Sequence, residues 1–488
     1  MKKIYTTFML ACPLMPSLAQ SGKVTSDEQP QSPNLVLIMA DQWRAQAVGF
    51  ENIEPVITPN MDQLVEKGVW FQNAMTNYPL SSPSRAMLMT GQYPLKNKVI
   101  HICQSQFAPY NVELPQDSKC WSDALHDAGY SLGYIGKWHL DMPYKPYVDT
   151  PNNKGEIAWN EWCPKERRHG FDYWTAYGTY DRHLNPMYWN TDDKRDEFFY
   201  AHQWGPEFEA DRAISYLKNE ESAYRKKDAP FALMVSMNPP HTGYNLVPDK
   251  YKEIYRGFDV EKACNRPNIP PKGTKGGDSY RKHIQDYYAC ITGVDEQIGR
   301  IIDALDEQGL SDNTIVVITS DHGNCMGIHG YEEKIIYYEE SVRIPLLIIW
   351  PDKIAPRKDD ELQISITDLC PTLLSMMGQS KKIPDEVQAF DLSKAVVTGK
   401  GFHPEFQPYY YIEPSDILTG RRGLRTSQYT LAVYAENGNV KDVVLFDRIN
   451  DPWQMNNIAD ERPNVVKKLT RKLKKWLLKT NDPYAKCL

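Results

Sequence analysis

The fold class is decided by the stretch Asn34-Leu35-Val36-Leu37-Ile38-Met39-Ala40, which is followed directly by Asp41-Gln42. An almost continuous apolar run of this length is typical of a strand that is buried on both faces. Similar apolar runs occur at Ser131–Ile135, Phe231–Met237, Thr314–Ser320 and Arg343–Trp350. We predict that these runs are buried parallel strands of one sheet.

Segments with the start and stop signals of helices separate the apolar runs. Thr58-Pro59 begins one helix that Gly68 ends, and Trp121–Ala128 and Gly293–Gln308 are each followed by a glycine. Alternation of strands and helices predicts an α/β fold, with a large mixed, mostly parallel sheet sandwiched by helices.

Polar side chains follow the predicted strands at the points where the strands end. Asp41 follows the first strand, Lys137 and His139 the second, His241 the third, and Asp321-His322 the fourth. Ligands of open α/β sheets bind beyond the carboxyl ends of the strands. We therefore expect one functional site at this edge of the sheet.

From about Asp385 the pattern changes to that of a smaller α+β subdomain. The sequence predicts short antiparallel strands at Tyr409–Ile412, Arg425–Val433 and Val443–Phe446, and a helix over Asn464–Leu478. We place a main domain at residues 20–384 and a C-terminal subdomain, with a short antiparallel sheet, at residues 385–488.

The C-terminal helix is amphipathic. Its apolar side carries Val466, Leu469, Leu473 and Trp476, and six Lys or Arg residues lie between Lys467 and Lys475. This pattern favours a helix that covers the small sheet and leaves a basic face in solvent. A surface that binds a polyanion is the alternative.

Residues 1–19 have the pattern of a signal peptide. Lys2 and Lys3 precede an apolar stretch, and Ser17-Leu18-Ala19 offers a cleavage site before Gln20. Cys12 raises a lipoprotein alternative, but Met9-Leu10-Ala11 is a poor lipobox. No later stretch approaches the ~20 apolar residues of a transmembrane helix. We expect a soluble exported protein, periplasmic or secreted.

The net charge of −7 argues against a nucleic-acid partner, although it allows a local positive pocket. Nine cysteines are scattered without a Cys-x-x-Cys pair, so the sequence gives no support for a zinc or redox site. One or two disulfides are compatible with export, but the pairing cannot be read from the sequence.

The segment Ser81-Ser82-Pro83-Ser84-Arg85, continued by Ala86–Gly91, predicts a short helix. Pro83 suits a first helical position, and Gly91 ends the helix about two turns later. Ser81 would then lie at a helix N-terminus, where free N–H groups favour an anion. Arg85 would lie one turn along on roughly the same face. An ordinary capped helix is the other interpretation.

This segment resembles the signature of the sulfatase family, in which the first residue is oxidised to formylglycine. The resemblance covers nearly the whole mature chain and includes Gly136–Leu140, Ser320–Gly323 and the stretch that begins at Lys334. Asn238-Pro239-Pro240-His241 stands where the family has His-x-Pro-His. The resemblance implies a serine-type enzyme that needs a radical maturase acting on Ser81.

The resemblance also implies a divalent cation held by Asp41, Gln42, Asp321, His322 and the modified Ser81. Oxygen ligands suit Ca²⁺. The nitrogen of His322 keeps Mg²⁺ and Mn²⁺ open as alternatives. Gln42 departs from the common Asp-Asp pair, and His322 departs from the common Asn.

For the reaction, the resemblance implies that Arg85, Lys137 and Lys334 neutralise the sulfate oxygens. His139 would help remove a proton from the hydrated formylglycine, and His241 would protonate the leaving alcohol. A second hydroxyl on the hydrate would then expel sulfate and re-form the aldehyde.

Arg182 and His183 are candidates for substrate contacts. They lie in an insertion from about Pro143 to Trp204 that is rich in Trp and other aromatic residues. Aromatic faces with nearby Arg, His and Asp are typical of a sugar-binding wall, although a crowded loop core has the same composition.

The leading functional hypothesis is hydrolysis of a sulfate monoester on a carbohydrate. A phosphonate or phosphodiester hydrolase of the same superfamily is one alternative, because Gln42 and His322 depart from the common sulfatase residues and phosphonate-hydrolase-like relatives have His at the position of His322. A non-catalytic protein that binds sulfated glycans is the other.

Overall fold

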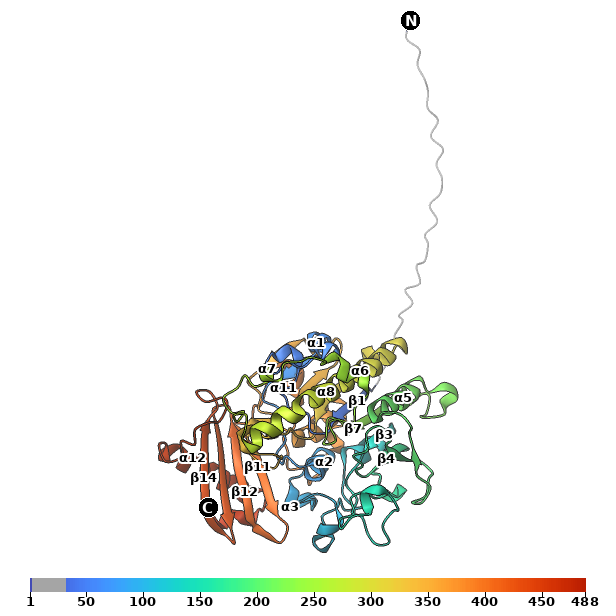
Figure 1. The fold of residues 1–488 in the computed structure, drawn as a ribbon. Coiled ribbons are helices and arrows are strands. Elements are labelled where there is room, and N and C mark those ends of the chain that lie inside the picture. The colour runs from blue at the N-terminus through green and yellow to red at the C-terminus, as the bar shows by residue number, and fades with distance from the viewer. Residues whose placement is uncertain (2–31) are drawn as a thin grey trace. The chain divides into compact units, whose positions relative to one another are not determined.

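The computed structural model describes Met1 and residues 32–488. The predicted signal peptide, with Cys12, lies outside the described residues apart from Met1. A ten-stranded sheet has the order β10-β2-β9-β8-β1-β7-β3-β4-β5-β6 (Figure 1). Its strands are β1 Asn34–Ala40, β2 Val69–Phe71, β3 Ser131–Lys137, β4 Tyr173–Tyr177, β5 Met187–Asn190, β6 Phe199–Tyr200, β7 Phe231–Met237, β8 Thr314–Ser320, β9 Leu346–Ile349 and β10 Arg357–Asp359.

The centre of this sheet is parallel, as the sequence predicts. β1 pairs in parallel with β7 and β8, and β3 pairs in parallel with β7 and β4. Ala40 lies beside both Met237 and Ser320 in the register. The carboxyl ends of β1, β7 and β8 are therefore level, and the residues that follow them emerge at one edge.

The prediction that Arg343–Trp350 forms a parallel strand is wrong. β9 begins only after Pro345 and runs antiparallel to both β8 and β2. Proline has no N–H to donate to a ladder. Between β8 and β9 the chain forms only a 3-10 turn and the four-residue helix α9, Glu339–Val342. Since this connection contains no helix that carries the chain back to the opposite edge of the sheet, the chain returns antiparallel.

Helices cover both faces of the large sheet. Leu35, Leu37 and Met39 belong to one apolar cluster, whereas Val36 and Ile38 belong to another, as expected for a strand buried on both faces. The helices of this region are α1 Pro59–Leu64, α2 Ser81–Thr90, α3 Pro94–Asn97, α4 Trp121–His126, α5 Gly205–Lys218, α6 Asp249–Ile254, α7 Val260–Ala263, α8 Lys275–Glu307, α10 Leu369–Met376 and α11 Ser393–Thr398.

The helix α8 is longer than predicted, because Gly293–Gln308 covers only its C-terminal part. Thr274 caps its start by accepting a hydrogen bond from the N–H of Gly277 at 3.2 Å. A Cβ atom on Gly277 would lie 2.1 Å from the carbonyl oxygen of Pro271. This close approach requires glycine at position 277. Because glycine has a low helix propensity, the sequence does not predict a helix that begins here.

A four-stranded antiparallel sheet follows, drawn in orange to red in Figure 1. Its strands are β11 Phe406–Glu413, β12 Asp416–Thr426, β13 Tyr429–Glu436 and β14 Asn439–Asp447. The single strand predicted at Arg425–Val433 is wrong, since a hairpin turn divides it. The hydroxyl of Thr426 accepts hydrogen bonds from the N–H groups of Gln428 and Tyr429, which stabilises this turn without a glycine.

The helix α12, Pro463–Lys479, buries Leu469, Leu473 and Trp476. The indole N–H of Trp476 donates to the hydroxyl of Tyr410 in β11 at 2.9 Å, which fixes the helix against the small sheet. The basic residues Lys467, Lys468, Arg471, Lys474 and Lys475 are exposed. The helix thus has the buried apolar side and the solvated basic face that its sequence predicts.

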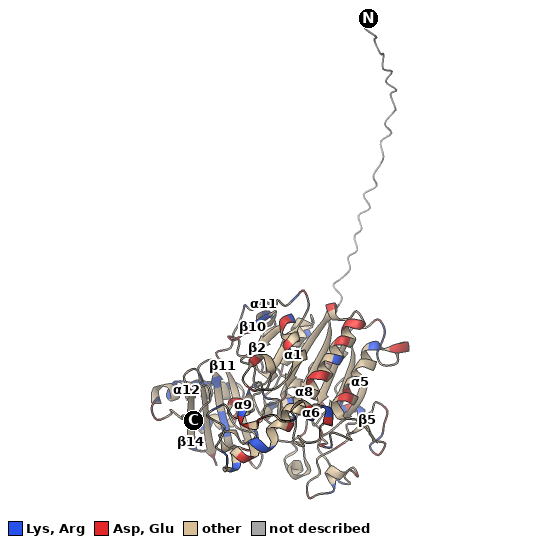
Figure 2. Ribbon diagram, turned by 45° about the horizontal axis from the view of Figure 1, so that its top comes forward, with Lys and Arg blue, Asp and Glu red and all other residues tan. Residues whose placement is uncertain are grey.

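Acidic residues mark α5 and α8 in Figure 2, in keeping with the net charge of −7. In the part of the chain that the structure describes, the cysteines are free, and six of these eight are buried. Within residues 32–488, none of the helices combines the length and apolar character that crossing a membrane requires.

Candidate active site

Ser81 is the first residue of α2. Leu80 precedes it in an extended conformation, and the carbonyl oxygen of Leu80 accepts the N–H of Ser84 at 3.0 Å. Pro83 is the third helical residue rather than the first, still within the turn where a missing N–H costs no helical hydrogen bond. Gly91 ends the helix with a φ of 64°. Ser81 therefore lies at a helix N-terminus, as predicted, and is 1% exposed.

Two loops at the carboxyl edge of the sheet meet at Ser81. Its Oγ lies 3.2 Å from Oδ2 of Asp41, which follows β1, and 3.0 Å from Nε2 of His322, which follows β8. Asp41, Asp321 and His322 are fully buried, and their ligand atoms lie within 4.8 Å of one another. The structure thus brings together four of the five residues predicted to hold a cation.

The tautomer of His322 suits metal binding. Its Nδ1 lies 2.8 Å from the carbonyl oxygen of Gly323, which can only accept a hydrogen bond. The proton is therefore on Nδ1, and the lone pair of Nε2 is directed to the site. Burial and the charge of Lys334 hold the pKa of His322 well below its usual value, so the ring is neutral.

Gln42, the fifth predicted ligand, has a φ of 70°, a conformation that non-glycine residues adopt mainly under constraint. Its N–H donates to Oδ1 of Asp321 at 3.1 Å, and its side-chain amide donates to the hydroxyl of Tyr244 at 3.1 Å. The amide oxygen accepts a hydrogen bond from Lys334 and so is the atom that faces the site.

The donor set fits a divalent cation. The two carboxylates and the neutral imidazole offer ligand atoms within 4.8 Å of one another, and the Ser81 hydroxyl contacts Asp41 and His322. Burial and the charge of Asp41 raise the pKa of Asp321 to about 7. Burial alone would raise the pKa of Asp41 too, but Lys137, His241 and Arg85 hold it well below its usual value. A bound cation would relieve the repulsion between the two carboxylates.

Arg85 is 2% exposed and connects both acidic loops. Its Nη2 atom lies 2.9 Å from Oδ2 of Asp41, and its Nε atom lies 3.1 Å from Oδ2 of Asp321. Its Nη1 atom donates to the carbonyl oxygen of Lys137 and to the hydroxyl of Ser236. Arg85 thereby holds the ends of β1, β3, β7 and β8 together beneath Ser81.

Two lysines add positive charge. Lys137, which is fully buried, lies 2.8 Å from Oδ2 of Asp41 and donates to Oδ1 of Asn238 at 3.0 Å. Lys334 is 7% exposed and lies 3.1 Å from Nε2 of His241. Three buried cationic side chains, Arg85, Lys137 and Lys334, therefore lie close to the two carboxylates of the site.

His139 has a φ of 56° and is 2% exposed. Neither of its ring nitrogens has a hydrogen-bond partner among the described residues. Burial, Lys137 and Arg85 hold its pKa well below the usual value. The ring is therefore a neutral imidazole with free nitrogens at the wall of the site.

A cavity of about 740 Å³ adjoins the site and reaches it at three of the residues described above. His139, His241 and Lys334 line it, together with Leu80, His101, Ile102, Pro151, Asn152, Gly155, Glu156, Ile157, Trp159, Thr179, Asp181, Thr242, Glu333 and Ile335. The aromatic insertion therefore supplies one wall through Trp159.

Arg182 and His183 do not line this cavity. Arg182 is exposed, and His183 is buried with Nε2 placed 3.0 Å from the carbonyl oxygen of Thr242. His183 thus anchors the insertion to the loop that carries His241. Asp181, beside them, faces the cavity instead and was missed because one carboxylate in a polar loop gives no distinguishing signal.

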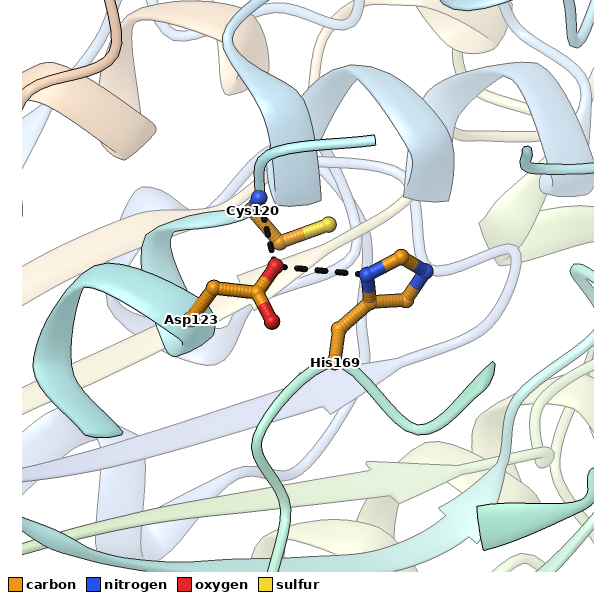
Figure 3. A group of neighbouring side chains, drawn as sticks. All are labelled: Cys120, Asp123 and His169. Atoms are coloured by element: carbon orange, nitrogen blue, oxygen red, sulfur yellow. Dashed lines mark hydrogen bonds and ion pairs between the residues drawn. The ribbon is translucent and has the colours of Figure 1, made fainter. Parts of the chain in front are cut away.

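Cys120, Asp123 and His169 form a separate group of possible metal ligands (Figure 3). Oδ2 of Asp123 accepts the N–H of Cys120 at 2.9 Å and lies 3.2 Å from Nδ1 of His169. The first contact is half of a capping box at the start of α4. Helix capping and its pairing with His169 account for the position of the carboxylate.

Comparison with known proteins identifies the family. The family model described as Sulfatase matches residues 33–379, and that described as N-sulphoglucosamine sulphohydrolase, C-terminal, matches residues 327–482. The endo-4-O-sulfatase of Bacteroides thetaiotaomicron is 36% identical over 94% of this chain and 94% of its own. The ulvan-active sulfatase of Formosa agariphila is 32% identical, covering 94% and 84%.

Solved structures agree. The crystal structure of yidJ from Bacteroides fragilis has 58% identity and a TM-score of 0.91, covering 95% of this chain and 99% of that one. A Bacteroides thetaiotaomicron structure from a study of glycosaminoglycan metabolism has 35% identity and a TM-score of 0.85, covering 93% and 98%. The chain therefore belongs to the sulfatase family of sulfuric ester hydrolases.

Proposed function

We propose that this sulfatase is exported and removes O-sulfate groups from glycans, using formylglycine at Ser81 and one divalent cation. The observation that carries the proposal is the position of Ser81. Its Oγ lies 3.2 Å from Asp41 and 3.0 Å from His322 at the N-terminus of a buried helix, above Arg85.

Oxidation of Ser81 would supply an aldehyde whose hydrate can attack sulfur and be regenerated. The cation, held by Asp41, Gln42, Asp321, His322 and residue 81, would supply positive charge against the sulfate oxygens. The ligand oxygens favour Ca²⁺, and the imidazole of His322 keeps Mg²⁺ and Mn²⁺ as alternatives.

The remaining roles belong to groups around the anion. Arg85, Lys137 and Lys334 are buried cations that can neutralise sulfate oxygens as charge shifts in the transition state. His139 has two free ring nitrogens, so it can take a proton from the attacking hydroxyl. His241 lies at the cavity wall, where it can give a proton to the departing oxygen.

A glycan substrate is supported by the cavity and by the relatives. The cavity has the volume of a small-molecule site and an aromatic side chain, Trp159, on which a sugar ring can stack. The matched relatives are named as an endo-4-O-sulfatase and an ulvan-active sulfatase. Export is supported by the sequence of residues 1–19 alone.

The proposal is tested with protein coexpressed with a serine-type maturase. Mass spectrometry of the peptide that contains residue 81 should show a loss of about 2 Da relative to serine. Sulfate release should then be measured on defined 2-, 3-, 4- and 6-sulfated sugars, with phosphate diesters as the competing class. An unmodified Ser81 would favour a binding protein, and faster cleavage of diesters would refute the assigned substrate.

Export is tested separately by expressing the full chain and a variant without residues 2–19. The full chain should be recovered from the periplasm or medium and the variant from the cytoplasm. Equal retention in the cytoplasm would overturn this part of the proposal. Recovery in the membrane fraction, lost in Cys12→Ser, would instead identify a lipoprotein.

A further inference from the structure

Asp181 is the carboxylate closest to His241 on the side away from the cation site. Its Oδ1 lies 3.1 Å from Nδ1 of His241. The Asp181 side chain is 40% exposed, whereas that of His241 is 14% exposed. Asp181 comes from the aromatic insertion and His241 from the loop after β7, so two distant segments form this pair.

The partners of His241 determine which ring nitrogen carries the proton. Lys334 Nζ lies 3.1 Å from Nε2, and an ammonium group can only donate. Nε2 is therefore the acceptor, and the proton of the neutral ring is on Nδ1, facing the Asp181 carboxylate. The hydroxyl of Thr242 lies 3.1 Å from Nδ1 and can accept its proton as well, but this hydroxyl is uncharged and Thr242 is exposed.

Asp181 is itself held in place by Asn238. The side-chain amide of Asn238 donates to Oδ1 of Asp181 at 2.9 Å, and its carbonyl oxygen accepts from Lys137 at 3.0 Å. Asn238 is 1% exposed and occupies the position where the family signature has a histidine. A continuous chain of contacts thus runs from Lys137 through Asn238 and Asp181 to His241.

We infer that Asp181 is a positioning residue that, held by Asn238, aims Nε2 of His241 at the departing oxygen of the sulfate ester. The inference rests on the proposed function, since it concerns the same reaction. For this step the ring must carry a proton on each nitrogen, and Nε2 takes up the second proton from solvent in the cavity once Lys334 has turned to the bound sulfate. As the bond between sulfur and the departing oxygen breaks, that oxygen keeps the electron pair and takes the Nε2 proton, while the attacking oxygen bonds to sulfur. The carboxylate of Asp181 remains charged throughout, stabilises the ring while it carries both protons, and still accepts the hydrogen bond from Nδ1 when the ring has returned to its neutral form.

This role predicts a dependence on the leaving group. A sugar alkoxide is a poor leaving group and needs the proton, whereas 4-nitrophenolate leaves without one. For Asp181→Ala, kcat on a sugar sulfate should fall about 100-fold. On 4-nitrophenyl sulfate, kcat of Asp181→Ala should stay within about 3-fold of the value for the chain without substitutions, and KM should change little on either ester.

A double-mutant cycle separates positioning from a general structural effect. His241→Ala should show the same leaving-group pattern, and adding Asp181→Ala to it should cost no further activity, because Asp181 acts through that ring. Asp181→Glu should restore part of kcat on the sugar ester. The matched control is Asp192→Ala, which removes an exposed carboxylate of the same insertion that pairs with Lys165.

Equal losses on both esters, or losses that multiply in the double variant, would overturn the role of Asp181. Full activity of Asp181→Ala on the sugar ester would do the same. If the chain without substitutions, with formylglycine formed at Ser81, released sulfate from neither ester, the proposed function would fail and the inference with it. Thermal unfolding of each variant checks that the fold is retained.

Discussion

Nε2 of His322 lies 3.0 Å from Oγ of Ser81, although 241 residues separate them in the chain. The loop after β8 and the N-terminus of α2 meet at this contact. Because Nδ1 is committed to the carbonyl oxygen of Gly323, the ring presents an unprotonated nitrogen to the same point as Asp41 and Asp321. A cation bound at this point would join segments that are distant in the chain, so its binding should raise the Tm as well as support activity.

Removal of divalent cations with EDTA is expected to lower the Tm and abolish sulfate release. The buried carboxylates of Asp41 and Asp321 would then have only Arg85 and Lys137 as counter-charges, and burial together with the charge of Asp41 would raise the pKa of Asp321. Returning Ca²⁺ at about 100 times its Kd should stabilise the fold by about 2.7 kcal/mol. Parallel titrations with Mg²⁺ and Mn²⁺ identify the preferred ion.

His322→Ala should reduce this cation-dependent rise in Tm, because it removes one ligand. His169→Ala, in the group that Asp123 centres on, is the control and should leave the rise unchanged. A Tm that does not respond to EDTA or to any of the three ions would contradict the assigned cation site.

Ser81→Ala is expected to abolish turnover on every ester and leave the fold intact. The hydroxyl contacts only Asp41 and His322 among the described residues, so its removal breaks no link to the apolar core. Sulfate release and Tm are the two measurements. Ser82→Ala is the matched control, since that hydroxyl accepts only the N–H of Cys103. Residual turnover in Ser81→Ala within about 10-fold would refute the nucleophile.

His139→Ala should lower kcat by about 100-fold or more while costing little stability. Neither ring nitrogen has a partner among the described residues, so no hydrogen bond is lost with the ring. His183→Ala provides the contrast, because that ring is tied to the carbonyl oxygen of Thr242 and its loss should lower the Tm. A large loss of stability in His139→Ala with normal kcat would reverse the assignment.

The central strands and the residues after them could be predicted from the sequence because their signals are local. Phe231–Met237 and Thr314–Ser320 are apolar along their whole length, and the structure has strands with these same bounds. Asp41 and Asp321 follow such runs directly. The register of the parallel strands then brings these carboxylates together without further information.

What could not be predicted depends on packing between distant segments. The direction of β9 follows from the absence of a crossover helix, and its short length follows from Pro345. The contacts of Asp181 with Asn238 and His241 arise only when the loop after β4 meets the loop after β7. No spacing in the sequence relates these residues, so their pairing becomes visible only in three dimensions.

A buried ion-pair network supports both acidic loops from below. Arg44, two residues after Gln42, contacts both carboxylate oxygens of Glu54 at 2.7 Å. It also donates to the carbonyl oxygen of Asn324, in the loop after β8. Arg266 lies 2.9 Å from the same carboxylate. Glu54→Gln would leave the buried guanidinium of Arg44 without its counter-ion and that of Arg266 with only Glu340, 3.8 Å away, at a cost of about 3–5 kcal/mol.

The pH dependence of stability gives this network its own signature. Burial would raise the pKa of Glu54, but Arg44 and Arg266 lower it to about 2, whereas an unfolded glutamate titrates near about 4.3. The Glu54 carboxylate therefore stays ionised to a lower pH in the folded state than in the unfolded state. Its contribution is complete above about pH 4.3 and is lost as the pH falls towards 2, a change of about 3 kcal/mol.

The free energy of unfolding, measured with urea between pH 5 and pH 3, should therefore change less steeply with pH for Glu54→Gln than for the chain without the substitution. The difference in slope should correspond to up to one fewer proton taken up on unfolding. Glu307→Gln, at an exposed carboxylate that ends α8, is the control and should follow the unmodified chain. Glu54→Gln already lacks the charge that acid would remove, so its stability starts lower and falls less. Identical slopes for the two chains would show that acid unfolding does not act through Glu54.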